Sequence, residues 1–194
     1  LASSAASDVY KRQGSKRQPG STFKILAAYA PAIDSCGKSL STIVVDEPYK
    51  YKNGKNVKNA SRSYKGAVTY RTAIANSINV CAVKVSDEIS QELGFEYCEK
   101  FGISTLVKEK KTDAGVFSDI NQTLALGGVT DGVYNYELCA AYATIANGGT
   151  YNTPTLYTKI VDHDGNVLLE NPGESHQAIK EGTASLLTLS LIHI

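Results

Sequence analysis

The chain of 194 residues has no methionine, no tryptophan and only three histidines. It also lacks a hydrophobic run long enough to cross a bilayer, because its best candidate, residues 25–33, is short and contains Pro31. Positive and negative charges nearly balance, with a formal net charge of +1. Charged residues make up 20% of the chain and hydrophobic residues 42%. These values indicate a soluble globular protein of one domain and exclude a disordered tail, a collagen-like chain and a dedicated polyanion binder.

The two ends of the sequence lack the apolar periodicity of the rest. Residues 1–13 are small and polar, then basic, without the apolar core of a signal peptide. We expect residues 1–13 and 189–194 to be non-native linker sequence, and residues 14–188 to form part of a domain. Because methionine is absent, we expect the sequence to be a fragment or a processed chain.

The four cysteines form no C-x-x-C pair, and no histidine lies at metal-ligand spacing. Cys81 and Cys139 fall in apolar helical patterns, so we expect both to be buried thiols. The pairing state of these two and of Cys36 and Cys98 stays open. The sequence therefore predicts no metal site and no cofactor.

Lysines gather between residues 50 and 65, a pattern that can indicate nucleic-acid binding. No aromatic and glycine signature of RNA binding accompanies them, and the whole chain is nearly neutral. Asn53-Gly54 is a strong tight-turn dipeptide in the middle of this region. We therefore interpret the region as a solvated hairpin and predict no nucleic-acid partner.

The apolar pattern predicts several helices and one late hairpin, which indicates an α/β or α+β domain whose main sheet is poorly represented. The clearest helical stripe is formed by residues spaced three or four apart: Ile74, Ile78, Cys81, Val85 and Ile89. The expected elements are a helix over 21–33, a strand over 41–45, helices within 67–93, a short helix bracketed by Gly94 and Gly102, a helix over 135–147, a hairpin over 155–170 and a helix from about Ser175.

Two Ser-x-x-Lys motifs occur, and physical context separates them. Ser21 and Lys24 open a good helix, where residues three apart share a face and the positive end of the dipole favours an oxyanion. We expect Ser21 to be the N-cap of this helix. Ser35 and Lys38 follow a proline and enclose a glycine, so nothing fixes the two side chains against each other. We therefore choose the first motif.

Ser77 and Asn79 form the sequence's Ser-x-Asn motif. In an unbroken helix, positions two apart point to nearly opposite faces, so the two side chains could not line one cleft. The segment 76–79 is, however, rich in residues that cap helices. We predict a break between two helices here, with the polar pair on the turn; an ordinary helix junction is the alternative.

In this order and with their flanking words, the motifs resemble the penicillin-binding transpeptidase domain, most like that of bifunctional class A penicillin-binding proteins. The resemblance runs from about Gly14 to Thr188 through RQPGSTFK, SYKGAVTYRTAIANSINVCAVKV, TLALGG, YELCAAYATIANGGTYNTP and KIVDHDGNVLLE. It implies the serine β-lactamase/transpeptidase-like fold, here mostly the helical lobe plus the late hairpin, with most of the central sheet missing.

The resemblance also implies roles. Ser21 would attack the carbonyl of a peptidoglycan D-Ala-D-Ala stem peptide and form an acyl-enzyme, and a β-lactam would acylate it instead. Lys24 would take the serine proton, Ser77 would pass a proton to the leaving amine, and Asn79 would hold Lys24 and the substrate. The implied parent protein carries a glycosyltransferase domain and an upstream membrane segment, and acts outside the cytoplasmic membrane.

The family's third motif, Lys-Thr/Ser-Gly, is not in this sequence. Lys180-Glu181-Gly182 has a glutamate where a hydroxyl is expected, so we interpret Lys180 as a surface lysine. We therefore expect the fragment itself to be a poor enzyme. A class A β-lactamase needs a Glu-x-x-x-Asn that does not occur here, but another serine β-lactamase or a β-lactam sensor domain remains an alternative.

Overall fold

The computed structural model describes residues 14–113 and 115–191. The segment 1–13, predicted to be linker, lies outside this range, as do residues 192–194 of the predicted tail; residues 189–191 end the last helix. The helices have the following bounds: η1 Gly20–Thr22, η2 Ile25–Tyr29, α2 Ala30–Ser35, α3 Tyr70–Ala75, α4 Asn79–Ile89, α5 Gln91–Lys100, η3 Leu124–Leu126, α6 Asn135–Ala146 and α7 Glu181–Leu191.

The strands of the described residues pair only in twos, and every pair is antiparallel. The pairs are β1 Lys16–Arg17 with β8 Val133–Tyr134, β2 Ile43–Asp46 with β5 Gly66–Thr69, β3 Tyr49–Lys50 with β4 Asn56–Val57, β6 Lys110–Thr112 with β7 Gly115–Phe117, β9 Thr150–Asn152 with β12 Ser175–Gln177, and β10 Lys159–Val161 with β11 Val167–Glu170. This agrees with the expected helical lobe and late hairpin.

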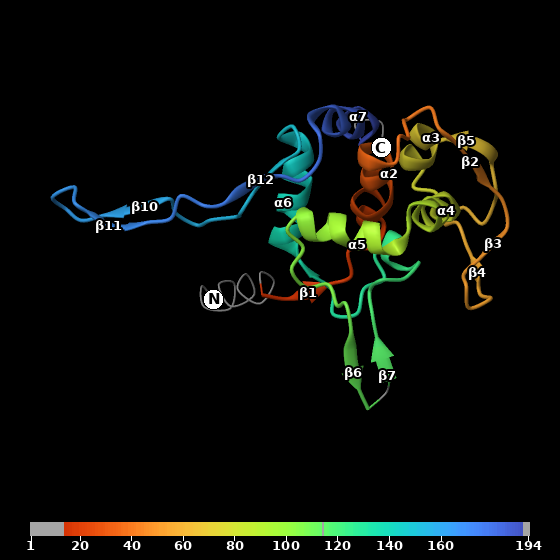
Figure 1. Cartoon of the computed structure of the whole chain (residues 1–194), viewed down its shortest axis with the longest axis horizontal. Coiled ribbons are helices and arrows are strands. Elements are labelled where there is room, and N and C mark those ends of the chain that lie inside the picture. The colour runs from red at the N-terminus through yellow and green to blue at the C-terminus, as the bar shows by residue number, and fades with distance from the viewer. Residues whose placement is uncertain (1–13, 114, 192–194) are drawn as a thin grey trace, which may run out of the picture.

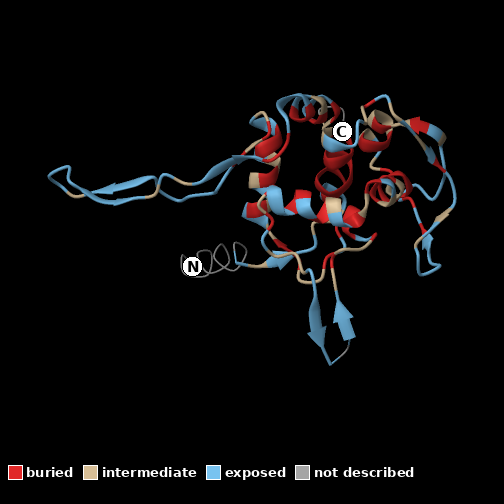
Figure 2. Ribbon diagram, in the orientation of Figure 1, coloured by how far each residue is buried: buried red, intermediate tan, exposed pale blue. Residues whose placement is uncertain are grey.

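A buried helix runs through the middle of the molecule, and the other helices surround it (Figure 1). Every residue from Phe23 to Ile33 is buried, and α4, α5 and α7 pack against this segment. The predicted stripe on α3 and α4 also faces this core, since all five of its residues are buried. Figure 2 shows the buried residues concentrated in this centre, while β6–β7 and β10–β11 project from it as exposed hairpins.

The helix predicted over residues 21–33 is present, but it is not a regular α-helix along its whole length. It begins as a 3-10 turn over η1, is α-helical at residues 23–24, becomes π-helical over η2 and is α-helical again from Ala30. Pro31 explains the irregularity, because it has no amide proton to give Ala27 and its ring crowds that carbonyl. The α5 helix approaches the same carbonyl: a Cβ at Gly94 would lie 2.4 Å from Ala27 O.

Four predictions about local structure need correction. Residues 67–69, expected to be helical, lie in strand β5, because Gly66–Thr69 pairs with β2 in a register that joins Asp46 to Gly66. Residues 175–177 form strand β12, and the last helix begins at Glu181. Gly94 lies inside α5 and does not bracket it. Cys139 is exposed, whereas Cys81 is buried as expected; all four cysteines are free thiols.

Candidate functional site

Ser21 lies on an exposed turn that two glycines hold in place. Gly20 has φ +58°, and Gly127, with φ +69°, packs so closely on it that an added Cβ would lie 2.3 Å from the Gly20 carbonyl oxygen. Gln18 exchanges two hydrogen bonds with the backbone of Val129, at 2.6 and 3.0 Å. The loop after η3 therefore fixes the position of the turn that carries Ser21.

The capping role predicted for Ser21 is wrong. The residue that precedes the 3-10 turn is Pro19, and Thr22 Oγ1 donates to its carbonyl at 2.7 Å. Among the described residues, the Ser21 hydroxyl has no hydrogen-bond partner. Its oxygen is thus open to solvent at the N-terminal end of the central helix.

Lys24 is buried, with 3% of its surface exposed, and its amine is held by the second motif. The Nζ atom donates to the Ser77 carbonyl at 2.5 Å, to Ser77 Oγ at 2.9 Å and to Asn79 Oδ1 at 2.6 Å. Residues more than 50 positions apart in the sequence therefore meet at one ammonium group. The structure brings Lys24, Ser77 and Asn79 together, as the resemblance implied, but the described hydrogen bonds of Lys24 Nζ do not include the Ser21 hydroxyl.

A break between α3 and α4 presents Ser77 and Asn79 on the same side. Ser77 has φ +49°, a conformation that costs a non-glycine residue on the order of 1 kcal/mol or more. Its amide donates to Ile74 O, and the Ile78 amide donates to Ala73 O, which closes the end of α3. Helix α4 then starts at Asn79. The prediction of a turn, not a continuous helix, is confirmed.

Burial lowers the pKa of Lys24 from 10.5 to about 8, and a smaller interaction with the Cys81 thiol acts in the opposite direction. Desolvation disfavours the charged amine, whereas the three oxygen acceptors favour it. A pKa near 8 leaves roughly a tenth of the amine unprotonated at neutral pH. Lys24 can therefore act as a base close to physiological pH.

The second Ser-x-x-Lys motif is not assembled into a site. Ser35 Oγ donates to Pro31 O at 2.9 Å, and Lys38 pairs with Glu88. Lys180 is exposed, as predicted: its amide donates to Asp34 Oδ1 and its Nζ to Asp34 O, which ties the start of α7 to the end of α2. Neither lysine lies against a serine hydroxyl in the described hydrogen bonds.

Sequence reasoning missed the residues that support the site. Gln18 precedes the turn that carries Ser21 and Gly127 packs on that turn, but the partners of both lie more than 100 positions away in the chain. Gln18 lies in the segment RQPG and Gly127 in the segment TLALGG. Both segments contributed to the family resemblance, but the sequence alone gave no physical reason for either residue. In the described part of the chain, no cluster of three or more His, Cys, Asp or Glu could hold a metal, and every helix is too short or too polar to cross a bilayer.

Comparison with known proteins places this geometry in a family. Residues 3–193 match the family described as the penicillin binding protein transpeptidase domain. Penicillin-binding protein 1A of Clostridium acetobutylicum is 36% identical over 180 residues, which are 88% of this chain and 21% of that protein. The corresponding protein of Clostridium botulinum (strain Hall) is 35% identical and gives the same coverage of the relative. The chain thus spans about a fifth of the length of these relatives.

Solved structures show the same fold at lower identity. The penicillin-binding protein PonA1 of Mycobacterium tuberculosis matches with a TM-score of 0.77 and 23% identity, over 92% of this chain and 48% of that one. The imipenem acyl-enzyme complex of penicillin-binding protein A from M. tuberculosis matches with a TM-score of 0.77 and 19% identity, over 94% of this chain and 45% of that one. Because the family model covers nearly the whole chain and relatives of that family are about 35% identical to it, the chain belongs to the penicillin-binding protein transpeptidase domain family.

Proposed function

We propose that this chain carries the serine nucleophile and its supporting residues in a serine D,D-transpeptidase that cross-links peptidoglycan stem peptides. The observation that carries the proposal is the buried Lys24 amine, which has a pKa of about 8 and is held by Ser77 and Asn79 one helical turn from the exposed Ser21. Such an amine has the basicity that proton abstraction from a hydroxyl requires near neutral pH. Stem peptides ending in D-Ala-D-Ala and β-lactams are the proposed partners.

The proposed reaction has two halves. Neutral Lys24 accepts the Ser21 proton while the serine oxygen bonds to the carbonyl carbon of the penultimate D-Ala. The bond to the terminal D-Ala nitrogen then breaks, and Ser77 relays the proton to that leaving amine. An amine of a neighbouring stem attacks the ester, loses its proton to the same groups and restores Ser21. A β-lactam follows the first half, but its leaving nitrogen stays attached and blocks the second.

Location and domain context follow from this substrate. Stem peptides lie outside the cytoplasmic membrane, so we place the site on the extracytoplasmic face, in a parent protein held by a membrane segment. One solved relative is titled the D,D-transpeptidase domain of a peptidoglycan glycosyltransferase, which supports a glycosyltransferase domain in the same parent. The substrate-binding strand with the third motif is assigned to that parent as well.

Covalent labelling tests the proposal. Fluorescent penicillin should label the full-length protein that contains this chain, and mass spectrometry should find the adduct on Ser21. Ser21→Ala should abolish the label. Ser35→Ala is the matched control, because Ser35 belongs to the other Ser-x-x-Lys but bonds to a backbone carbonyl. An adduct on Ser35, or labelling that persists in a folded Ser21→Ala protein, would overturn the assignment.

A further inference from the structure

The orientation of the Asn79 amide depends on a backbone carbonyl 21 positions earlier in the chain. Asn79 Oδ1 accepts from Lys24, and Asn79 Nδ2 donates to Lys58 O at 2.7 Å. A flipped amide would direct its NH₂ group at the ammonium and its oxygen at the carbonyl, and both contacts would be repulsive. The Lys58 carbonyl therefore determines that the oxygen of the Asn79 amide, and not its NH₂ group, points toward Lys24.

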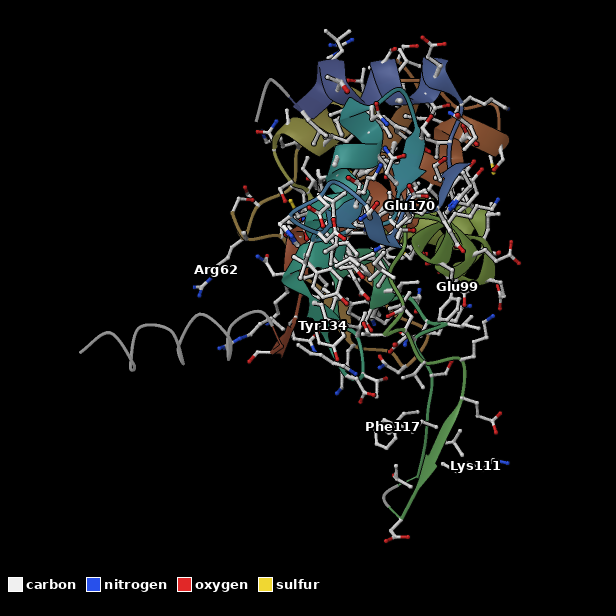
Figure 3. The ribbon with its side chains drawn as sticks, turned by 90° about the vertical axis from the view of Figure 1, so that its left-hand side faces the viewer. Arg62, Glu99, Lys111, Phe117, Tyr134 and Glu170 are labelled. Atoms are coloured by element: carbon white, nitrogen blue, oxygen red, sulfur yellow. The ribbon has the colours of Figure 1, made fainter. Side chains whose placement is uncertain are left out.

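Val57, directly before Lys58, is buried in a small cluster with Val80 and Val83 of α4, whereas the loop over residues 58–65 is held mainly by hydrogen bonds. Residues 60–65 are exposed, and Arg62 points away from the body of the molecule (Figure 3). Lys58, Asn59, Arg62 and Tyr64 line a hollow of about 490 Å³. Asn59 is the one buried residue between positions 58 and 65, with 7% of its surface exposed.

Asn59 connects the loop to two rigid elements. Its Oδ1 accepts from the Val80 amide at 3.1 Å, and its Nδ2 donates to Asp46 Oδ1 at 2.8 Å and to Ser63 O at 3.0 Å. Asp46, 1% exposed on β2, also accepts from the Lys65 amide. Helix α4 needs such a partner, because Ile78, the residue before its first turn, offers no side-chain cap.

We propose that Asn59 is a positioning residue for the catalytic lysine. It caps α4 from a distant loop, fixes the Lys58 carbonyl beside the first residue of that helix, and thereby orients Asn79 toward Lys24. The path consists of the contacts Asp46–Asn59, Asn59–Val80 and Lys58–Asn79, all between 2.7 and 3.1 Å. The orientation of Asn79 by this path does not depend on the proposed function, whereas the expected effect on acylation does.

A double-mutant cycle tests this path in the full-length protein that contains the chain. Asn59→Ala and Asn79→Ala should each lower the second-order rate of fluorescent-penicillin acylation, roughly ten- to a hundredfold, as expected for hydrogen bonds to charged groups. In the Asn79→Ala background, Asn59→Ala should have almost no further effect. Additive losses would mean that Asn59 acts only on stability and would overturn the proposal.

Gln91→Ala is the matched stability control. Gln91 is also a side-chain amide with 7% exposure, and its Nε2 likewise donates to an aspartate, Asp87 Oδ1 at 2.8 Å, and to a backbone carbonyl. It contacts α4 away from the site, so this variant should lower the thermal unfolding midpoint as Asn59→Ala does, with an acylation rate near that of the wild type. An equal loss of rate in both variants would contradict a specific role for Asn59.

A second readout does not require acylation. Lys24 is labelled with a small amine-reactive compound, and the extent of labelling is measured by mass spectrometry across a range of pH. The pH dependence gives the Lys24 pKa in each variant. Loss of the Asn79 acceptor removes a bond to the charged form, so the pKa should fall in Asn59→Ala and in Asn79→Ala and fall no further in the double variant. If penicillin does not label the wild type, the proposed function fails; if Asn59→Ala leaves the Lys24 pKa unchanged, the positioning role fails.

Discussion

Replacing Asn79 with aspartate should move the activity of the site to higher pH. The substitution keeps the shape of the side chain but puts a negative charge where an amide oxygen lies 2.6 Å from Lys24 Nζ. A neighbouring opposite charge favours the charged form of the amine and shifts a pKa by about 1–3 units. The Lys24 pKa, about 8 in the native protein, should therefore rise.

The expected loss of rate follows from the fraction of neutral lysine. At pH 7 an amine with a pKa near 8 is roughly one-tenth neutral, and a rise of one to three units lowers that fraction at least about tenfold. If neutral Lys24 is the base, Asn79→Asp should slow penicillin acylation at pH 7 by about tenfold or more. Part of that rate should return as the pH rises toward 9.5.

The assay measures the second-order rate of fluorescent-penicillin acylation between pH 6 and 9.5. Asn79→Ala is the matched control, because it removes the same contact without adding a charge. Both variants should be slower than the wild type, but the midpoint of the pH profile should move up in Asn79→Asp and down in Asn79→Ala. A midpoint that stays near 8 in both would refute the assignment of Lys24 as the titrating base.

Three further predictions concern stability. Gly127→Ala, whose Cβ would meet Gly20 O at 2.3 Å at a φ of +69°, should lower the thermal unfolding midpoint and the acylation rate together. Gly94→Ala should cost about 2 kcal/mol or more in urea unfolding, because its Cβ would press on Ala27 O at 2.4 Å; a smaller cost would mean that the helices separate easily. From pH 7.5 to 9, stability should rise more in the wild type than in Lys24→Met, since unfolded lysine keeps a proton that folded Lys24 loses near pH 8; parallel curves would contradict this.

The part of the site that local sequence determines was predictable. Capping residues at 76–79 indicated a break, and helix geometry placed Lys24 one turn after Ser21. The roles of Ser21, Lys24, Ser77 and Asn79 came from the resemblance and not from spacing. The structure adds that the lysine amine lies against the Ser-x-Asn turn and that the Ser21 hydroxyl has no bond to described residues.

The parts that depend on distant partners were not predictable. Residues 66–69 precede a strongly helical pattern, and only their pairing with β2 makes them a strand. Cys139 lies in an apolar sequence, yet the side of α6 that it occupies is not covered in this structure. Asn59 gave no sequence signal at all, because an asparagine in a lysine-rich loop is typical of a solvated turn. Its importance depends on Asp46 and Val80, which folding brings to it.

Two of the residues proposed to be catalytic, Ser77 and Lys24, are held in the fold at an energetic cost. Ser77 adopts a positive φ, and Lys24 buries an amine whose lowered pKa measures the penalty of removing its charge from water. Surrounding contacts offset both costs: the closed end of α3 fixes Ser77, and hydrogen bonds from Lys24 Nζ to Ser77 and Asn79 stabilise the buried amine. A more stable arrangement, with a solvated lysine, would have an amine of ordinary basicity that is almost fully protonated at neutral pH. The burial that costs stability at Lys24 is therefore also the cause of its proposed basicity near neutral pH.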